Sequence, residues 1–397
     1  MKILTFSTLF PNSEKPGHGI FVQTRLRHLV ASGEVEARVV APAPWFPFKH
    51  PAFGQYARQA RVPRSEVRFG LQVEHPPYLV LPKVGMNVAP LLLAQAAKPA
   101  IGRLIDEGFD FDLIDAHYFY PDGVAAAMLS RYFNKPLVIT ARGSDVTLFP
   151  QFSLPRRMIK WAIRRADAVI TVANALRDEV VALGGDPERV TTLRNGVDLQ
   201  LFRPTERQPN QEFTLLTVGH LVPQKAQELS IGALPLLPDT RLVIAGEGPN
   251  RAMLENLARS LKVEHRVNFL GAVSQDQLRE QYNAADAMVL SSSREGWANV
   301  LLESMACGTP VVASRVHGTP EVVAAPEAGV LMNERTPQGV AEGVHQLRAS
   351  YPDRAATRRY AERFSWDDTT AGQLAIFQAI LRQGRVPALA SKAAQAR

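Results

Sequence analysis

The sequence is poorest in cysteine: Cys307 is the only one among 397 residues. A single cysteine excludes an intramolecular disulfide framework and any multi-cysteine zinc or iron–sulfur site. Long apolar runs are also missing, because Val88–Ala97 is among the longest and a membrane-spanning helix needs about 18 residues. Met1–Phe10 is a short apolar stretch interrupted by hydroxyl side chains, which predicts a first β-strand rather than a signal peptide. Together these features predict a cytoplasmic protein.

The sequence also lacks the glycine motifs of dinucleotide-binding and ATP-binding proteins. Gly17-His18-Gly19 follows the first apolar run, but position 22 is valine where a dinucleotide fingerprint needs a third glycine. Gly246-Glu247-Gly248 has Arg251 at the corresponding position, and no Walker A loop occurs. We therefore expect neither a dehydrogenase nor a kinase. Each glycine pair remains compatible with a tight turn or with close approach of the backbone to a phosphate.

Positive charge is concentrated in the first half of the chain. Residues 1–205 contain 25 Lys and Arg against 18 Asp and Glu, whereas residues 206–397 contain 20 of each. The segment Arg156–Arg165, which includes Trp161, and the arginines between 58 and 68 are the most basic stretches. Two interpretations stay open: an ordinary solvated surface, or a surface for anionic lipid headgroups or a phosphate-bearing acceptor. No nucleic-acid partner is expected.

The order of apolar runs and helical segments predicts two α/β domains. A content of 46% hydrophobic and 21% charged residues is typical of globular proteins, and the length exceeds one ordinary core. We predict strands over 3–7, 37–41, 113–116, 137–140, 168–171, 190–193, 213–218, 241–245, 266–270, 287–290 and 310–313. We predict helices over 21–32, 123–133, 173–183, 226–237, 251–261, 275–284 and 299–306. Strands rich in Val, Ile and Leu with little alternation indicate parallel, doubly wound sheets.

A polar segment over 203–212, with two prolines, predicts the linker between the domains. We therefore expect one domain over 1–205 and a second over 206–365. A last helix over about 366–383 is expected to pack back on the first domain. Sheets of this class bind ligands at the carboxyl ends of their strands, which predicts a cleft between the domains.

Two segments of the second half carry groups suited to a phosphorylated sugar. Lys225 lies between a predicted strand and helix, where its ammonium group can donate to a diphosphate. Glu295 and Glu303 are eight residues apart, and the helix is expected to begin near Asn299. Glu295 would then lie in the preceding loop and Glu303 inside the helix, whose first N–H groups can meet a phosphate. A surface lysine and solvated glutamates are the simpler interpretation of each residue alone.

In order along the chain, these motifs resemble the family 4 glycosyltransferases. Glu295 through Glu303 is similar to the family's glutamate-x7-glutamate signature, and Gly17-His18-Gly19 resembles its N-terminal glycine loop. Further similar segments are Asp115-Ala116-His117, Pro121-Asp122-Gly123, Thr140–Asp145, Arg194–Asp198 and Ala245–Pro249. The resemblance covers nearly the whole chain and implies the α/β GT-B fold, in which two Rossmann-like doubly wound domains face each other across a cleft.

The resemblance implies a retaining enzyme that moves a hexosyl unit from a nucleoside-diphosphate sugar and needs no metal. It assigns catalysis to Glu295, His117 and Lys225, and the acceptor side to His117, Arg142 and Asp145. It assigns donor binding to Gly17, Gly19, His220, Lys225, Glu295, Gly296, Asn299, Val300, Leu301 and Glu303. Two positions depart from the family pattern: His220 replaces a usual arginine, which weakens one phosphate contact or makes it pH-dependent, and Arg142 replaces a common histidine.

Several functional questions stay open on the sequence. A nucleotide-sugar 2-epimerase has a similar fold, and a non-catalytic sugar-binding protein could also have two such lobes. The donor nucleotide is UDP or GDP. Together with the basic first half, the resemblance implies a glycan or polyprenyl-diphosphate-linked acceptor in surface polysaccharide assembly. The enzyme would then make peripheral contact with the cytoplasmic face of the membrane.

Overall fold

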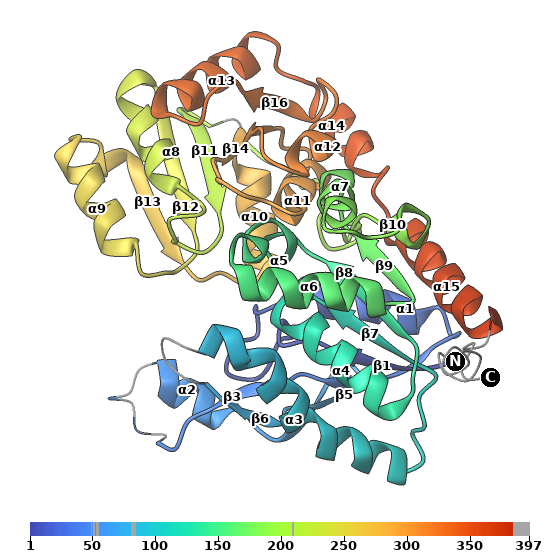
Figure 1. Ribbon diagram of the computed structural model, residues 1–397. Helices are drawn as coiled ribbons and strands as arrows, with labels where there is room; N and C mark the ends of the chain where they lie inside the picture. The colour runs from blue at the N-terminus through green and yellow to red at the C-terminus, as the bar shows by residue number, and fades with distance from the viewer. Residues whose placement is uncertain (49, 51, 53–54, 81–84, 209, 384–397) are drawn as a thin grey trace, which may run out of the picture. The chain divides into compact units, whose positions relative to one another are not determined.

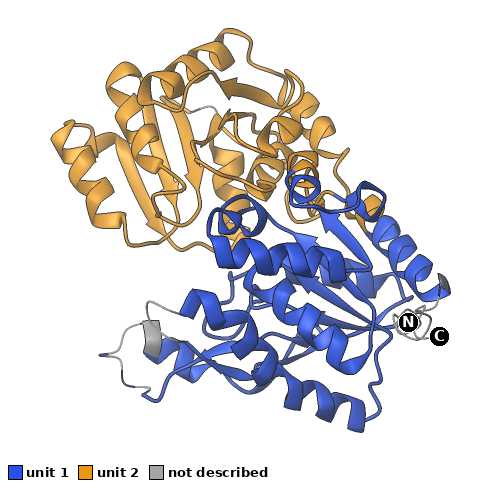
Figure 2. Cartoon of the chain, viewed as in Figure 1, with its two compact units in different colours: residues 1–171, 179–193, 370–397 blue, residues 172–178, 194–369 orange. Residues whose placement is uncertain are grey.

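The computed structural model describes residues 1–48, 50, 52, 55–80, 85–208 and 210–383. The chain divides into two compact units (Figure 2). Unit 1 comprises Met1–Thr171, Glu179–Leu193 and the described residues from Thr370 onward. Unit 2 comprises Val172–Asp178 and Arg194–Thr369. Residues 194–205, which we predicted to close the first domain, therefore group with unit 2, and the domain limits given above remain a proposal.

Unit 1 is built on an eight-stranded sheet with the order β10-β9-β8-β7-β1-β2-β5-β4 (Figure 1). All neighbours are parallel except β4 and β5, which form an antiparallel edge that the sequence analysis did not predict. β7 and β8 are buried at every position, which explains their unbroken apolar sequence. The strands are β1 (Lys2–Phe6), β2 (Glu36–Val40), β4 (Ser65–Arg68), β5 (Leu71–Glu74), β7 (Leu113–His117), β8 (Leu137–Ala141), β9 (Ala168–Thr171) and β10 (Val190–Thr192), with a separate pair β3 (Ala43–Trp45) and β6 (Pro77–Leu79).

Helices cover both faces of this sheet. On one face, Val22, Leu26 and Leu29 of α1 pack with Leu374 and Phe377 of α15 onto apolar strand residues. On the other face α4 contacts β7 and β8 and packs against α3 and α6. The helices are α1 (Ile20–Ala31), α2 (Gln55–Arg61), α3 (Gly85–Asp106), α4 (Val124–Phe133), α5 (Ser144–Thr147) and α6 (Ser153–Arg165); α7 (Asn174–Ala182) and α15 (Trp366–Gln383) are divided between the two units, with most of α15 in unit 1.

Unit 2 is built on a six-stranded, all-parallel sheet with the order β13-β12-β11-β14-β15-β16. In sequence order this is 3-2-1-4-5-6, the arrangement of a Rossmann sheet, with the reversal between β11 and β14. The strands are β11 (Phe213–Val218), β12 (Thr240–Ala245), β13 (Val267–Gly271), β14 (Ala287–Leu290), β15 (Val311–Ser314) and β16 (Gly329–Met332).

The helices of unit 2 also lie on both faces of their sheet. α8, α9 and α13 form an apolar core with the strands on one face, and α10 and α11 contact β11, β14 and β15 on the other. The helices are α8 (Gln227–Ala233), α9 (Arg251–Ser260), α10 (Gln275–Ala284), α11 (Asn299–Ala306), α12 (Thr319–Val322), α13 (Pro337–Ala349) and α14 (Arg354–Ala361). The fold class is therefore as predicted, with two Rossmann-like α/β units.

One helix corrects the expectation about apolar runs. Among the described residues, α3 is the helix that is long and apolar enough to cross a membrane by length and composition alone. It includes Pro90 and continues through Pro99, beyond Ala97, where the predicted apolar run ended. Core helices of soluble proteins pass the same test, and 39% of the apolar window of α3 is buried.

Candidate active site

In unit 1 the predicted site residues gather where the strand order reverses, between β1 and β7. The loops that follow these two strands leave the sheet at neighbouring carboxyl ends, a place where α/β sheets bind ligands. Gly19 ends the first loop with φ 69°, and a Cβ atom there would lie 2.3 Å from the Leu9 carbonyl carbon. Only glycine fits this position. Gly17, in contrast, is exposed and has open space around it, so the fold does not require its glycine.

His117, the last residue of β7, is buried and held at both ring nitrogens. Its Nε2 lies 3.3 Å from Asp115 Oδ2, and its Nδ1 lies 2.8 Å from Arg142 Nη2. Because arginine can only donate, Nδ1 accepts and Nε2 carries the proton. Burial lowers the pKa of His117 to about 4, and Asp115 opposes this shift only in part. The imidazole is therefore neutral at physiological pH.

A chain of buried polar groups extends from His117 to the last helix, and the sequence analysis did not predict it. Gln373 Nε2 of α15 donates to Asp115 Oδ2 at 3.0 Å, and Gln373 Oε1 accepts from Arg25 Nε at 2.7 Å. Burial lowers the pKa of Arg25 to about 10, while Asp115 favours its charged form. Asp115 is two residues before His117 in a strand, so one face carries both side chains. This spacing was visible in the sequence, but Arg25 and Gln373 gave no comparable signal.

Asp145 and Arg142 join the turn after β8 to the neighbouring segments of unit 1. Asp145 accepts from the backbone N–H groups of Phe119, Gly143 and Arg142, with the first two at 2.7 and 2.6 Å. Its carboxylate therefore fixes the turn after β8, and burial raises its pKa in spite of these bonds. Arg142 also stacks over the Phe21 ring, with 5.3 Å between its guanidinium carbon and the ring centre. The acceptor-side role of both residues remains a prediction.

In unit 2 the predicted residues again gather at the strand-order reversal, between β11 and β14. Lys225 follows β11 and Glu295 follows β14, and Lys225 Nζ donates to Glu295 Oε1 at 2.6 Å. The loops are tied together by the Ser293 N–H, which donates to the Gln224 carbonyl oxygen at 2.8 Å. An ammonium group has three N–H donors, so this pair leaves two of them for other oxygens.

The glycine-rich loops of unit 2 pack backbone against backbone. Gly246 has φ 146°, and a Cβ atom there would lie 2.0 Å from the Gly219 carbonyl oxygen. A Cβ atom at Gly248 would lie 2.4 Å from the Leu221 carbonyl oxygen. His220 is exposed beside these loops, and its Nδ1 lies 3.3 Å from the Glu247 carbonyl oxygen. The glycines therefore let the two loops approach, which is a structural reason for the motif.

Helix α11 begins at Asn299, as predicted, and no side chain caps its N-terminus. Its first N–H groups lie at Asn299 and Val300, directly after the loop that contains Gly296. Asn299 Oδ1 accepts from Asn195 Nδ2 at 3.2 Å, which fixes this end of the helix. The Leu301 side chain is fully buried, so this residue can offer only backbone groups to a ligand.

Glu303 lies one turn inside α11 and is partly buried. Tyr282 Oη donates to Glu303 Oε2 at 2.9 Å. Burial nevertheless raises the pKa of Glu303 to about 7, because one neutral hydrogen bond does not replace the lost hydration of a carboxylate. A functional site is a frequent place for such a shift.

The described residues contain no group of three or more His, Cys, Asp or Glu side chains that could hold a metal ion. Asp110 and Asp112 have Asp-x-Asp spacing, but each has a partner. Asp110 pairs with Lys135, and Asp112 accepts from the Lys2 N–H group.

Comparison with known proteins identifies the family. A model of the glycosyl transferases group 1 matches residues 200–364, and a model of glycosyltransferase family 4 matches residues 17–201. A glycogen synthase from Mycobacterium tuberculosis is 30% identical over 299 residues, which are 71% of this chain and 72% of that protein.

The chain belongs to the family 4 glycosyltransferases.

This glycosyltransferase is also 29% identical over 357 residues to TuaC of Bacillus subtilis, a protein named for teichuronic acid biosynthesis; 87% of this chain and 88% of TuaC are covered. Among solved structures, sucrose-phosphate synthase from Thermosynechococcus elongatus has a TM-score of 0.73 at 21% identity, with 96% of each chain covered. Anabaena HepE in complex with UDP has a TM-score of 0.70 at 21% identity, with 96% of this chain and 100% of HepE covered. These structures share the GT-B fold, and the resemblance inferred from the sequence is confirmed.

Proposed function

We propose that this glycosyltransferase moves a hexosyl unit from a nucleoside-diphosphate sugar to a glycan or polyprenyl-diphosphate-linked acceptor, with retention of the anomeric configuration. The arrangement at the β11–β14 reversal carries the proposal. It brings Lys225, Glu295 and the uncapped N-terminus of α11 to one end of one sheet, with Glu303 one turn further along the helix.

Each of these groups suits one part of the donor. Glu303 can accept from the two ribose hydroxyls, and the two remaining N–H donors of Lys225 can bind diphosphate oxygens. At the start of α11 the Asn299 and Leu301 N–H groups donate to the Trp297 and Ala298 carbonyl oxygens, and the Val300 N–H between them adds a second positive site for phosphate. Glu295 orients Lys225 through their 2.6 Å contact and can accept from a sugar hydroxyl. His220 is exposed beside the same loop and can contribute a further donor.

The chemistry follows from where charge develops. As the bond from the anomeric carbon to the diphosphate oxygen breaks, negative charge grows on the leaving group, and fixed cationic and N–H donors stabilise it. The acceptor hydroxyl attacks from the same face, and its proton passes to the departing phosphate. The neutral His117 of unit 1 adds no further cation, and its single N–H group faces Asp115 Oδ2, so it would have to leave Asp115 before it could donate to a sugar hydroxyl.

The proposed acceptor class is supported by the charge distribution along the chain and by the name of one relative. The excess of Lys and Arg lies in residues 1–205, and TuaC is named for teichuronic acid biosynthesis. We therefore place the enzyme at the cytoplasmic face of the membrane, in surface polysaccharide assembly.

Calorimetric titration with UDP and GDP, followed by measurement of nucleotide release from their sugars, tests this proposal. We expect saturable binding of one nucleotide and a release rate that rises when an acceptor glycan is added. Replacement of Lys225 by methionine should weaken binding, whereas Lys262→Met, at an exposed position in the same unit, should leave it unchanged. Equal binding by both variants, or release that no acceptor accelerates, would count against transfer.

A further inference from the structure

Helix α6 of unit 1 has more apolar surface than its packing uses. Pro155, Ile159, Ala162 and Ile163 are buried against the rest of the unit. A surface helix needs one such apolar stripe. A second apolar set, at positions 154, 158 and 161, lies outside that stripe, and Leu154 is 39% exposed.

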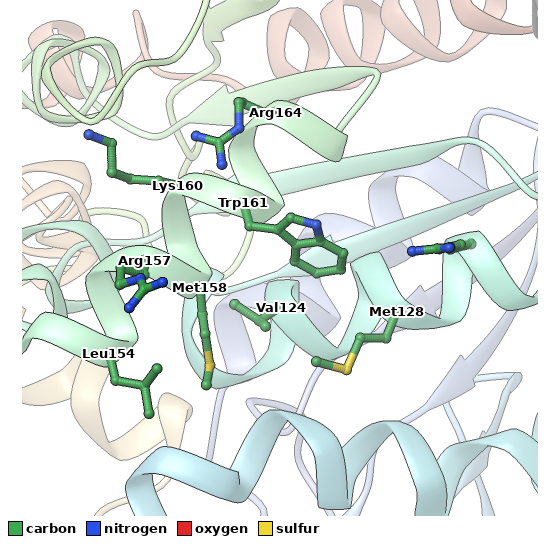
Figure 3. A pocket seen from close by; sticks show the side chains of 9 residues that line it. Val124, Met128, Leu154, Arg157, Met158, Lys160, Trp161 and Arg164 are labelled. Carbon is green, nitrogen blue, oxygen red and sulfur yellow. The ribbon is translucent and has the colours of Figure 1, made fainter. Parts of the chain in front are cut away.

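The second apolar set lines an open groove of about 810 Å³ between α6 and α4. Figure 3 shows Met158 and Trp161 of α6 turned toward the same space as Val124 and Met128 of α4. Methionine side chains adapt to irregular apolar ligands because they are unbranched and polarizable. The volume lies within the range of small-molecule sites, which is roughly 300–1,000 Å³.

Basic side chains border this groove. Arg157, Lys160 and Arg164 come from α6, and Arg131 comes from α4. Among the described residues none of these four side chains has an ion-pair partner, and no acidic residue lines the groove. Unneutralised cations beside an apolar floor are complementary to a molecule with an apolar chain and an anionic end.

We propose that the α4–α6 groove binds a single-chain amphiphile that ends in a phosphate or diphosphate. The chain lies over Met128, Met158 and Trp161, and the anionic end meets Arg157 and its basic neighbours. The groove is thus a binding site for the lipid part of the acceptor. The identity of this amphiphile as the acceptor lipid rests on the proposed function. The basic residues of the segment 156–165 therefore differ in their expected roles. Arg157, Lys160 and Arg164 line the groove, whereas Arg156 does not.

Titration calorimetry of the full chain with monomeric decyl phosphate tests the groove, with hexyl phosphate, neutral decyl maltoside and inorganic phosphate as matched ligands. Each buried methylene strengthens binding about fourfold. We therefore expect decyl phosphate to bind at least tenfold more tightly than hexyl phosphate or decyl maltoside, and inorganic phosphate to show no saturable binding. Comparable affinities for the two alkyl phosphates would refute an apolar floor, and tight binding of the maltoside would refute a phosphate end.

Two neighbouring arginines on α6, both exposed, give a matched pair of variants. Arg157→Gln should weaken decyl phosphate binding about fivefold, the effect of one basic residue near an anionic group. Arg156→Gln removes the same charge and should leave the affinity unchanged. Met158→Gln tests the floor and should reduce the preference for the longer chain.

Equal losses in the two arginine variants would overturn the proposal, as would binding to phosphatidylglycerol vesicles without binding to monomeric decyl phosphate. That second outcome would assign α6 to general contact with an anionic surface. Nucleotide release by the wild type on a soluble acceptor is measured separately. If the enzyme transfers sugar to a soluble acceptor but binds no amphiphile, the groove inference is refuted and the proposed function is not.

Discussion

Replacement of Glu303 by glutamine is expected to stabilise unit 2 above pH 7 while it weakens nucleotide binding. The pKa of Glu303 is raised from 4.5 to about 7 in the folded chain. Between these values the unfolded chain releases the proton and the folded chain retains it. The free energy of unfolding therefore falls as pH rises through this window and levels off above it. Glutamine has no proton to release, and its side-chain oxygen can still accept from Tyr282 Oη.

The size of the effect follows from the shift. A difference of about 2.5 pKa units corresponds to roughly 3 kcal/mol between the two protonation states. We expect Glu303→Gln to be about 2–3 kcal/mol more stable than the wild type at pH 8, with little difference at pH 4.5. Loss of the ionised acceptor for the ribose hydroxyls should weaken nucleoside diphosphate binding by about tenfold to a hundredfold.

Urea unfolding followed by circular dichroism at pH 4.5 and pH 8 measures the first effect, and titration calorimetry with UDP and GDP measures the second. At each pH, the free energy of unfolding of the wild type is subtracted from that of the variant. The change in this difference between the two pH values is the quantity to compare. Glu342→Gln, at an exposed position on α13, provides the control and should give a value near zero. The reasoning is refuted if Glu303→Gln gives the same value as this control. Unchanged nucleotide affinity would separately refute the ribose contact.

Two further variants test the roles of His220 and Gln373. His220→Arg should strengthen nucleoside diphosphate binding, because a guanidinium group keeps its positive charge and presents a fork of N–H donors that matches phosphate oxygens; weaker binding in calorimetry would contradict this. Gln373→Leu removes the amide that donates to Asp115, so that the carboxylate favours protonated His117 more strongly. The pKa of His117 should then rise from about 4 toward 6.5, and an unshifted acid limb in the pH–rate profile would show that Gln373 does not tune it.

The sequence alone predicted those strands and helices that depend only on neighbouring residues. β9 and β14 occupy the predicted residues, and α11 begins at Asn299, since a buried parallel strand is a short apolar run and a helix start follows from its neighbours. The family resemblance was also visible in the sequence, because ordered motifs do not depend on coordinates. The antiparallel edge formed by β4 and β5 was not predicted, because short edge strands have little apolar periodicity.

Only the tertiary structure decided which side chains meet. Lys225 and Glu295 are 70 residues apart, and they pair because the strand order places β11 beside β14. Asp115 and Gln373 are 258 residues apart, and their hydrogen bond depends on where the last helix packs in unit 1. The raised pKa of Glu303 has the same origin, since burial depends on the whole surrounding unit. Local sequence determines which groups are available, whereas long-range packing determines their partners and their protonation.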